Sequence, residues 1–518
     1  MAAIDSTTLK NPPVDAPLGK RWWALVALTL SILVIGLDTY VLATALPTLS
    51  AKLGATTSQL QWISAAYTLA WSGLLLPAGK LGDRLGRRKL LITGLGVFGV
   101  ASVIASQVKT ANELIATRAL MGAGAAMIMT LALALVPVIF PEEERNRAIT
   151  VTTIGTMLGM PLGPLLGGWM LTHFAWGWVF LINGPVIVLS LIGVFLWVPE
   201  SKDPTTPKLD WLGALMVVIG VSGMTYGIIE QPIDGWSSAK VLVGLVGGLL
   251  FMVAFVLWQR RAASPLVDLR LFLNRHFTWG SITFGMVSFA MMGGLFVLTP
   301  YLQLVQGASP QSTGVRLLPL IGAMLTGAAA GEKPAKKIGA KAIILLGIVV
   351  TAGGLVLLSS LHATSGYGSV ALGLAVFGLG LGLSIPLSVD TVLSSLPLSQ
   401  AGTGNGMSRT MQNISVSFSS AIIGSVLNSG FRNRIADGLQ GLSGAARDTA
   451  SASVAGAHSV AAGLPGDAGR QLTSLANTAY THGMAQSLLV SAAILAVTAV
   501  LTLLFLPRRG GHQEAKQD

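Results

Sequence analysis

The sequence predicts an all-α integral membrane protein with fourteen membrane-spanning helices, arranged as two six-helix bundles and a two-helix insert. Three features of the composition predict the membrane class: 52% of the 518 residues are hydrophobic, only 10% are charged, and the mean hydropathy is +0.70. A soluble protein carries about 25% charged residues. A soluble enzyme and a disordered chain are therefore excluded.

The number of spans follows from the apolar runs, because a helix crosses the hydrocarbon core, about 30 Å thick, with about 20 residues. Runs of about this length predict spans over residues 22–46, 60–78, 90–106, 113–139, 148–171, 179–198, 211–229, 239–257, 278–299, 313–330, 341–359, 369–393, 404–427 and 485–506. A cleaved signal peptide is the alternative for the first run. That run exceeds the roughly 7 to 15 apolar residues of a signal peptide and contains Asp38, so an uncleaved span is expected.

The distribution of positive charge predicts the orientation. An even number of spans places both termini on one side of the membrane, and most of the 33 Lys and Arg residues lie in loops on that side. The short opposite loops hold only Lys52 and Lys109. By the positive-inside rule, both termini are expected in the cytoplasm and the protein in the plasma membrane. The net charge of +12 thus reflects topology, and no nucleic-acid partner is expected.

Two polar linkers, residues 199–208 and 259–277, divide the spans into six, two and six. The predicted units are a cytoplasmic tail at 1–21, a first bundle at 22–200, an insert at 201–277, a second bundle at 278–507 and a cytoplasmic tail at 508–518. Residues 428–484 form a long extracellular loop, which is either a helical hairpin or a flexible linker. Residues 79–89, after the second span, are echoed by residues 331–341, after the tenth, as in transporters built from repeated bundles.

The motifs of catalysis are missing from the sequence. It contains no phosphate-binding loop of ATPases and no metalloprotease or serine-hydrolase motif. It also contains no cysteine, which excludes disulfides and thiolate metal sites. We expect no enzymatic activity, no cofactor and no metal site.

Ionisable groups at membrane depth cost about 2.5 to 3.5 kcal/mol on insertion scales and therefore indicate function. Asp38 lies roughly 24 Å along the first span from Trp22, at 1.5 Å per residue. Arg118 lies roughly 8 Å from the outer end of the fourth span, which runs in the opposite direction. The two groups match in depth and are predicted to pair. A carboxylate that alternates between an arginine and water can carry a proton, whereas a static pair that fixes helix register is the alternative.

A second pair is predicted in the cytoplasmic half. Asp390 lies near the end of the twelfth span and Arg409 near the start of the thirteenth. Asp390 is accordingly a second candidate for proton coupling. The alternative is that its side chain reaches the membrane interface and has no such role.

Four blocks of the sequence resemble the major facilitator superfamily and, within it, the fourteen-span drug:proton antiporters that include quaternary-ammonium exporters. Residues 37–47 contain Asp38, and residues 114–125 contain Arg118. The block after the second span is similar to the superfamily's cytoplasmic gate motif, with Gly79, Asp83, Arg84, Gly86, Arg87 and Arg88. The block in the fifth span is similar to a motif of antiporters, with Gly159, Gly163, Pro164, Gly167 and Gly168.

The resemblance implies proton-coupled efflux of small lipophilic drugs or antibiotics by alternating access, with the gate motif holding the cytoplasmic side closed. The expected partners are the substrate, protons and the lipid bilayer, and a monomer is expected. A substrate cavity between the bundles is expected to include Asp38, Tyr40, Trp62, Tyr67 and Arg409. Anchoring at the membrane interface is the alternative for the aromatic residues.

Three rivals remain open. One is an exporter dedicated to a single metabolite, such as a self-made antibiotic, a siderophore or an amino acid. Another is a membrane scaffold or sensor that transports nothing, and a third is proton-coupled uptake, which the fifth-span block disfavours. Export of divalent cations is disfavoured because residues 62–67, 317–324 and 406–412, where related exporters carry further acids, are neutral or basic.

Overall fold

The computed structural model describes residues 18–202, 210–262, 265–267, 269–396 and 398–507, and every regular element in this part of the chain is a helix. Of the two expected cytoplasmic tails, residues 1–17 and 508–518 lie outside the described residues. Residues 18–21 belong to the first helix.

The helices fall into three groups along the chain. The N-terminal half comprises α1 (Leu18–Leu53), α2 (Thr57–Leu85), α3 (Arg87–Ala105), α4 (Ala111–Ile139), α5 (Glu142–His173), α6 (Trp178–Leu181) and α7 (Asn183–Trp197). The insert comprises α8 (Trp211–Asp234), α9 (Ala239–Leu242), η1 (Val243–Gly247) and α10 (Gly248–Arg261). The C-terminal half comprises η2 (Leu269–Leu273), α11 (Arg275–Pro300), η3 (Tyr301–Val305), α12 (Pro310–Arg316), α13 (Leu318–Ile338), α14 (Ala340–Ser359), α15 (Tyr367–Leu393), α16 (Leu398–Ile435), η4 (Ala436–Leu439), α17 (Gly444–Ala452), α18 (Val454–Ala462) and α19 (Asp467–Phe505).

Every predicted span lies, to within a residue or two, inside one helix or a run of consecutive helices, several of which extend well beyond it. Among the described residues, 12 helical segments are long and apolar enough to cross a membrane. Helices α2 and α5 are not among these 12, although they have 29 and 32 residues. The protein is therefore an all-helical membrane protein that crosses the bilayer many times.

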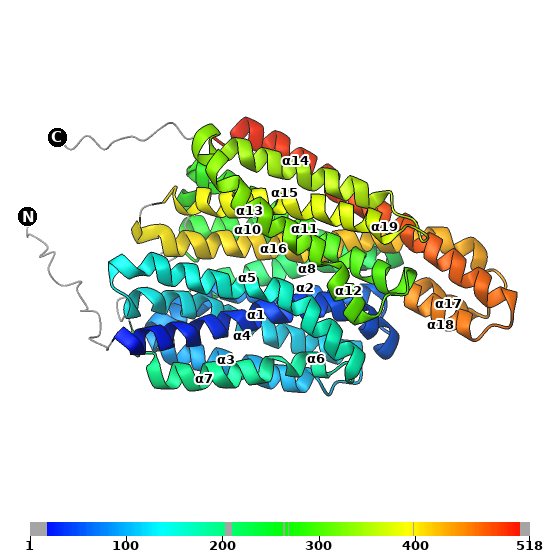
Figure 1. Ribbon diagram of the computed structural model, residues 1–518, viewed down its shortest axis with the longest axis horizontal. Coiled ribbons are helices and arrows are strands. Elements are labelled where there is room, and N and C mark those ends of the chain that lie inside the picture. The colour runs from blue at the N-terminus through cyan, green and yellow to red at the C-terminus, as the bar shows by residue number, and fades with distance from the viewer. Residues whose placement is uncertain (1–17, 203–209, 263–264, 268, 397, 508–518) are drawn as a thin grey trace, which may run out of the picture.

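The long helices run side by side, roughly along the longest axis of the molecule (Figure 1). Helix α1 begins and α19 ends at the same end of the molecule, which we call the terminal end. Helices α17 and α18 lie at the opposite end, which we call the hairpin end. An even number of crossings requires this arrangement of the chain ends.

Burial separates central from peripheral helices. In the spanning segment formed by α11 and η3, 83% of the residues in its most apolar stretch are buried inside the protein. The corresponding share is 22% in the segment formed by α9, η1 and α10. Apolar side chains of the latter segment, such as Val243 and Leu250, are more than half exposed. Lipid would cover such side chains in a bilayer, so α10 is peripheral and α11 is central.

The echoed sequences form the same local structure twice. Gly86 joins α2 to α3 with φ of +118°, and Gly339 joins α13 to α14 with φ of +91°. Both angles are accessible mainly to glycine because it has no Cβ atom. The repeat in sequence thus corresponds to a repeated helix–glycine–helix turn.

The insert is held at its base by Asp210, which precedes α8. Its carboxylate accepts hydrogen bonds from the backbone N–H of Gly213 (2.8 Å), from Trp258 Nε1 (2.9 Å) and from Gln259 Nε2 (2.6 Å). Burial alone would raise the pKa of Asp210, but these hydrogen bonds outweigh burial and lower it. Helix α8 contacts both α2 and α16, so the insert touches both halves.

The long predicted loop, residues 428–484, is helical over most of its length. Helix α16 continues to Ile435 and α19 begins at Asp467, so both ends of the segment are extensions of spanning helices. Only α17 and α18 form the hairpin, and α18 packs against α19. A helical hairpin is therefore confirmed in the middle of the segment. Ser443 and Ser453 cap the two short helices, so the structure favours the hairpin over the flexible linker.

Candidate functional site

Asp38 and Arg118 form the buried ion pair that their matching depth predicts. Nη1 of Arg118 on α4 donates to Oδ2 of Asp38 on α1 at 2.5 Å. The two side chains are 1% and 2% exposed. A buried charge persists only when it is paired and hydrogen-bonded, so each group stabilises the ionised form of the other.

Four further groups complete the surroundings of the pair. Nδ2 of Asn183, the first residue of α7, donates to Oδ1 of Asp38 at 3.3 Å. Nε of Arg118 donates to the carbonyl of Ile63 at 3.4 Å, and the ring of Tyr67 lies 4.2 Å from Arg118 Cζ. Met121 Sδ lies 3.8 Å from Nη1 of the same arginine. The pair is therefore enclosed by α1, α2, α4 and α7 of the N-terminal half.

Sequence reasoning did not assign a role to Asn183. Its signal was a neutral polar residue inside an apolar span, directly before Gly184 and Pro185. The structure places Asn183 where α6 ends and α7 begins, and it is fully buried. Its Nδ2 also donates to Ser102 Oγ at 3.3 Å, which links α7 to α3 as well as to α1.

The fifth-span motif packs directly against the segment of α1 that carries Asp38. A Cβ atom at Gly159 would lie 2.5 Å from the backbone of Gly36, and one at Gly163 would lie 2.5 Å from Tyr40 Cβ. A Cβ atom at Gly167 would lie 3.1 Å from Val41 Cγ1, a looser but still tight contact. Glycine at these positions is therefore required for the close approach of α5 to α1.

The other two residues of this motif contact the C-terminal half. A Cβ atom at Gly168 would collide with the backbone of Pro310 in α12, and one at Gly314 in α12 would collide with the backbone of Pro164. The motif thus has two faces: one lies against α1, and the other lies against α12 across the interface between the halves.

The gate motif is bound within the N-terminal half in this structure. Arg87 Nε donates to Asp83 Oδ1 at 2.8 Å, and Arg87 Nη1 donates to the carbonyl of Ala134 at 3.3 Å. Arg88 donates to the carbonyl of Phe195, whereas Arg84 is exposed. Gly79 packs against Thr130, and Gly86 forms the turn described above.

Glu200 is a partner of the gate motif that sequence reasoning missed. Its carboxylate accepts hydrogen bonds from the backbone N–H groups of Arg88 (3.1 Å) and Lys89 (3.3 Å) at the start of α3. A carboxylate at a helix N-terminus is stabilised by the free N–H groups there. Glu200 follows the sixth span in the sequence, and only the folded structure brings it next to the gate motif after the second span.

The predicted pair of Asp390 and Arg409 is not formed. Asp390 is exposed on α15, as the interface alternative requires, and the described residues contain no ion pair between the two. Nη1 of Arg409 instead donates to Gln412 Oε1 at 3.2 Å, and its Cζ lies 5.2 Å from the ring of Phe284. The depth of the two residues was estimated from span ends, and matching depth does not bring two side chains to the same face.

The predicted aromatic lining is divided between three environments. Trp62 packs against Tyr226 of α8, with ring centroids 6.3 Å apart, so it faces the insert and not the centre. Tyr67 is buried over the guanidinium of Arg118. Tyr40 is half-buried, and its phenol lies within electrostatic range of Arg409. Of the three aromatic residues, only Tyr40 is therefore at the interface between the halves and partly accessible.

Direct hydrogen bonds join the two halves toward the hairpin end. Gln61 Nε2 of α2 donates to the carbonyl of Ala421 on α16 at 2.8 Å. The hydroxyls of Thr68 and Ser417, also on α2 and α16, lie 2.6 Å apart. Nearer the hairpin end, Thr57 Oγ1 of α2 donates to the carbonyl of Ala452 at the end of α17 at 3.1 Å.

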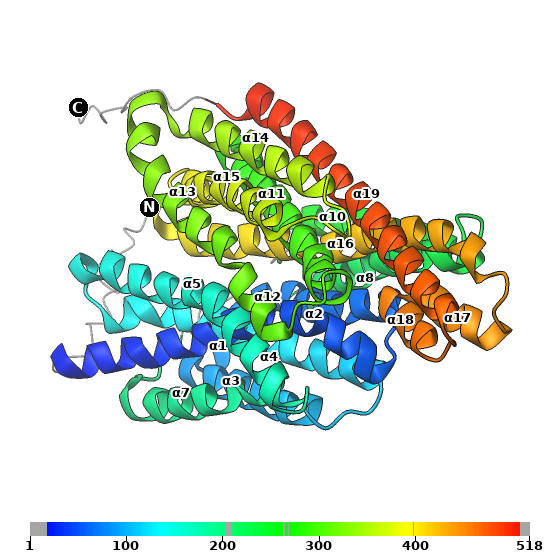
Figure 2. The same ribbon diagram turned by 45° about the vertical axis from the view of Figure 1, so that its right-hand side comes forward.

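The interface leaves little space at this end. Two cavities of about 30 Å³ each lie along it, and one of them is lined by Tyr67 and Arg118 together with Phe296 and Ser420 of the C-terminal half. Such a volume holds about one water molecule. Toward the terminal end, in contrast, α5 and α13 diverge (Figure 2). The two halves are therefore closed against each other at the hairpin end.

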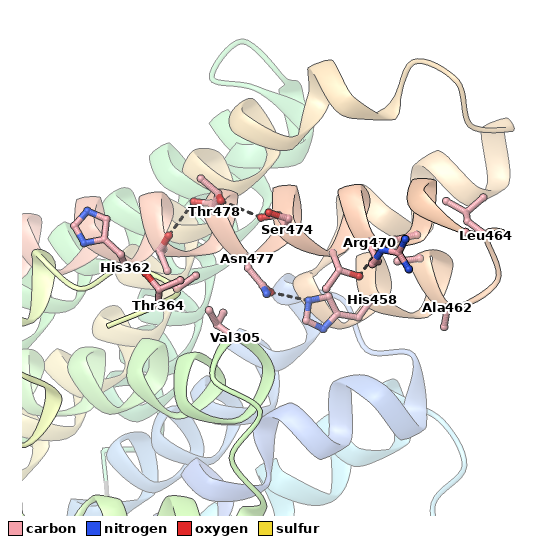
Figure 3. A pocket seen from close by; sticks show the side chains of 16 residues that line it. Val305, His362, Thr364, His458, Ala462, Leu464, Arg470, Ser474, Asn477 and Thr478 are labelled. Carbon is pink, nitrogen blue, oxygen red and sulfur yellow. Dashed lines mark hydrogen bonds between the residues drawn. The ribbon is translucent and has the colours of Figure 1, made fainter. Parts of the chain in front are cut away.

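A cavity of about 780 Å³ lies away from the ion pair. It is lined by α18, α19, η3 and the α14–α15 connection, and no residue of the N-terminal half lines it. His458 and Asn477 face each other across it, with Nε2 and Oδ1 2.8 Å apart (Figure 3). This surface hollow is separate from the interface between the halves.

Two packed helical halves, with a buried ion pair in the first half beside their interface, are typical of a membrane transporter. Residues 28–420 match the Major Facilitator Superfamily, and the chain belongs to this family of transporters. It is 32% identical to the multidrug efflux pump LfrA of Mycolicibacterium smegmatis over 96% of this chain and 99% of that protein. It is 30% identical to the tetracenomycin C resistance and export protein of Streptomyces glaucescens, covering 95% and 93% of the two chains.

Solved structures confirm the fold. The crystal structure of a bacterial homologue of the human lysosomal transporter Spinster superposes with a TM-score of 0.70, at 16% sequence identity. The match covers 96% of this chain and the whole of the other. The superfamily fold expected from the sequence motifs is thus correct.

Proposed function

We propose that the protein is a proton-coupled exporter of small lipophilic drugs or antibiotics. The observation that carries the proposal is the buried pair of Asp38 and Arg118 beside the interface between the halves. The names of its relatives, a multidrug efflux pump and an antibiotic resistance and export protein, support the direction of transport and the class of substrate. Secondary transport is consistent with the lack of any ATP-binding motif.

In this proposal, Asp38 carries the proton. In the state described here, its carboxylate accepts hydrogen bonds from both Arg118 and Asn183. A proton that reaches Asp38 removes the attraction to Arg118 and leaves the arginine to its contacts with Ile63 and Tyr67. This change weakens the tie between α1 and α4, and the two halves rock to the alternative state.

The orientation follows from the charges in the loops. The terminal end faces the cytoplasm, both termini are cytoplasmic, and the hairpin end faces outward across the plasma membrane. Closure at the hairpin end then makes the present state open toward the cytoplasm, where substrate is collected. The gate motif, now bound to α4 and α7, contacts the C-terminal half when the cytoplasmic side closes.

The same proposal includes fourteen spans, with α2 and α5 as the two that are polar in part. The halves and the insert correspond to residues 22–200, 278–507 and 201–277, and the functional unit is a monomer. Asp390, exposed near the cytoplasmic end of α15, is kept as a second proton-coupling candidate.

The test is substrate-induced proton movement in inverted membrane vesicles acidified inside. A panel of lipophilic cations and antibiotics is added to vesicles with the wild type or Asp38→Asn. We expect several compounds to release protons from wild-type vesicles and none to do so with the variant, at equal amounts of inserted protein. Equal proton release with Asp38→Asn would refute the role of Asp38.

A dedicated exporter is the second candidate, and the antibiotic named for one relative favours it. The same vesicle assay separates the two candidates. Activity with many unrelated compounds supports a multidrug exporter, and activity with one chemical family supports a dedicated one.

A further inference from the structure

Arg409 differs from Arg118 in having no carboxylate partner among the described residues. None of the ion pairs in this part of the chain includes it. Its Nη1 donates to Gln412, and its Nε is buried without a hydrogen-bond partner. At membrane depth, an arginine without a counter-charge is costly and is therefore a functional candidate.

The surroundings of Arg409 come from both halves. Phe284 of α11 lies beneath the guanidinium, and the phenol of Tyr40 on α1 lies within electrostatic range of it. The amide of Gln412 is oriented by its own Nε2, which donates to Ser288 Oγ at 3.1 Å, so that its oxygen accepts from Arg409. The guanidinium is thus held by neutral groups, at the boundary that opens and closes during transport.

The chemistry of these groups selects one class of ligand. A guanidinium presents several N–H donors in one plane and binds carboxylates and sulfonates through two parallel hydrogen bonds. Phe284 is buried and lies against the partly buried guanidinium, and a guanidinium also stacks on the ring of a planar aromatic molecule. Asp38 offers no counter-charge to a cation here, because Arg118 already neutralises it.

We propose that Arg409 is the substrate-recognition residue for aromatic organic anions: planar molecules that carry a carboxylate, a sulfonate or an acidic phenol. The inference rests on the proposed export function and specifies its substrate class. The anion supplies the charge partner that Arg409 lacks, whereas an aromatic cation meets an unscreened positive charge at the same place. Arg409 therefore favours acidic substrates and disfavours cationic ones.

The test compares two aromatic dyes of opposite charge, fluorescein and ethidium, in inverted vesicles with an imposed proton gradient. The variants are Arg409→Gln, which removes the charge, and Arg409→Lys, which keeps it. Arg316→Gln is the matched control, since Arg316 is another part-buried arginine of the C-terminal half and donates to Gln306 at 3.3 Å. The readout is the ratio of fluorescein to ethidium transport, which a general loss of folding or gating leaves unchanged.

We expect Arg409→Gln to lower this ratio about tenfold or more, as the loss of a charge-assisted hydrogen bond predicts. Arg409→Lys should retain an intermediate ratio, and Arg316→Gln should retain the wild-type ratio. An unchanged ratio in Arg409→Gln overturns the inference. So does a wild type that exports ethidium but not fluorescein, and in that case the proposed export function stands.

A binding measurement covers the case in which the wild type exports neither dye, which would refute the proposed function in these vesicles. Fluorescein binding to the purified wild type in lipid nanodiscs is followed by fluorescence anisotropy. Binding that weakens about tenfold in Arg409→Gln, with an unchanged gel-filtration profile, supports the anion site. Equal binding by the two proteins refutes it.

Discussion

At the scale of single residues, Asn183 and Arg118 are both hydrogen-bond donors to the carboxylate of Asp38. One carboxylate oxygen accepts from Arg118 and the other from Asn183. Replacing Asn183 with Ala removes a donor to the ionised form, so Asp38 becomes easier to protonate. We expect the pH profile of transport to move to higher pH, which is measured as transport rate against pH in vesicles.

Ser190→Ala is the control for this variant. Ser190 also lies on α7 and is also buried, but its hydroxyl lies 2.6 Å from that of Ser31 on α1, remote from the carboxylate. It should lower stability to a similar extent and leave the pH profile in place. A profile that is the same for Asn183→Ala and the wild type would contradict the assigned contact.

Charged residues inside apolar runs could be predicted from the sequence, whereas an amide inside a span and an acid in a linker could not. Asp38 and Arg118 were identified because charge in an apolar run is costly and the two depths agree. Asn183 and Glu200 were missed, since an amide in a span and an acid in a linker are common. The false pair of Asp390 and Arg409 shows that depth constrains position along the membrane normal but not the direction in which a side chain points.

At the scale of helices, one glycine of α5 and one of α13 should change stability in opposite directions when replaced with alanine. A Cβ atom at Gly163 would overlap Tyr40, whereas one at Gly322 on α13 meets nothing within 4 Å. Glycine in an exposed helix is less stable than alanine by about 0.5 to 1 kcal/mol, and overpacking costs about 1 to 3 kcal/mol. Gly322→Ala should therefore raise the melting temperature in detergent, and Gly163→Ala should lower it and reduce transport.

This prediction fails if both substitutions shift the melting temperature in the same direction.

Apolar runs in the sequence predict the positions of the spanning helices well, because a bilayer requires hydrophobic segments of a given length. They do not give lengths beyond the membrane. Helices α16 and α19 extend into the predicted loop, 428–484, where capping and contacts with α18 determine structure.

At the scale of the whole molecule, the absence of cysteine makes the closed hairpin end directly testable. Thr68 and Ser417 lie on α2 and α16 with hydroxyls 2.6 Å apart. The double variant Thr68→Cys and Ser417→Cys should form a disulfide on mild oxidation and lose transport, and a reductant should restore it. The cross-link is detected as a change in mobility on a non-reducing gel after cleavage in the linker between the halves.

Each single cysteine variant is the control, and both should transport with and without oxidant. Failure of the double variant to cross-link in the absence of substrate would show that this end is open at rest. The sequence could not indicate which end is closed, because the same residues must serve both states and the two differ by small free energies.

The position of the insert determines how a compound dissolved in the bilayer meets the interior. Helix α8 contacts both α2 and α16, so on that side protein separates the boundary between the halves from lipid. On the other side, α5 and α13 diverge toward the terminal end. We therefore expect hydrophobic molecules to enter from the bilayer on the side away from α8. For such molecules, the relevant concentration is the one in the membrane, so their partition coefficient enters the apparent affinity.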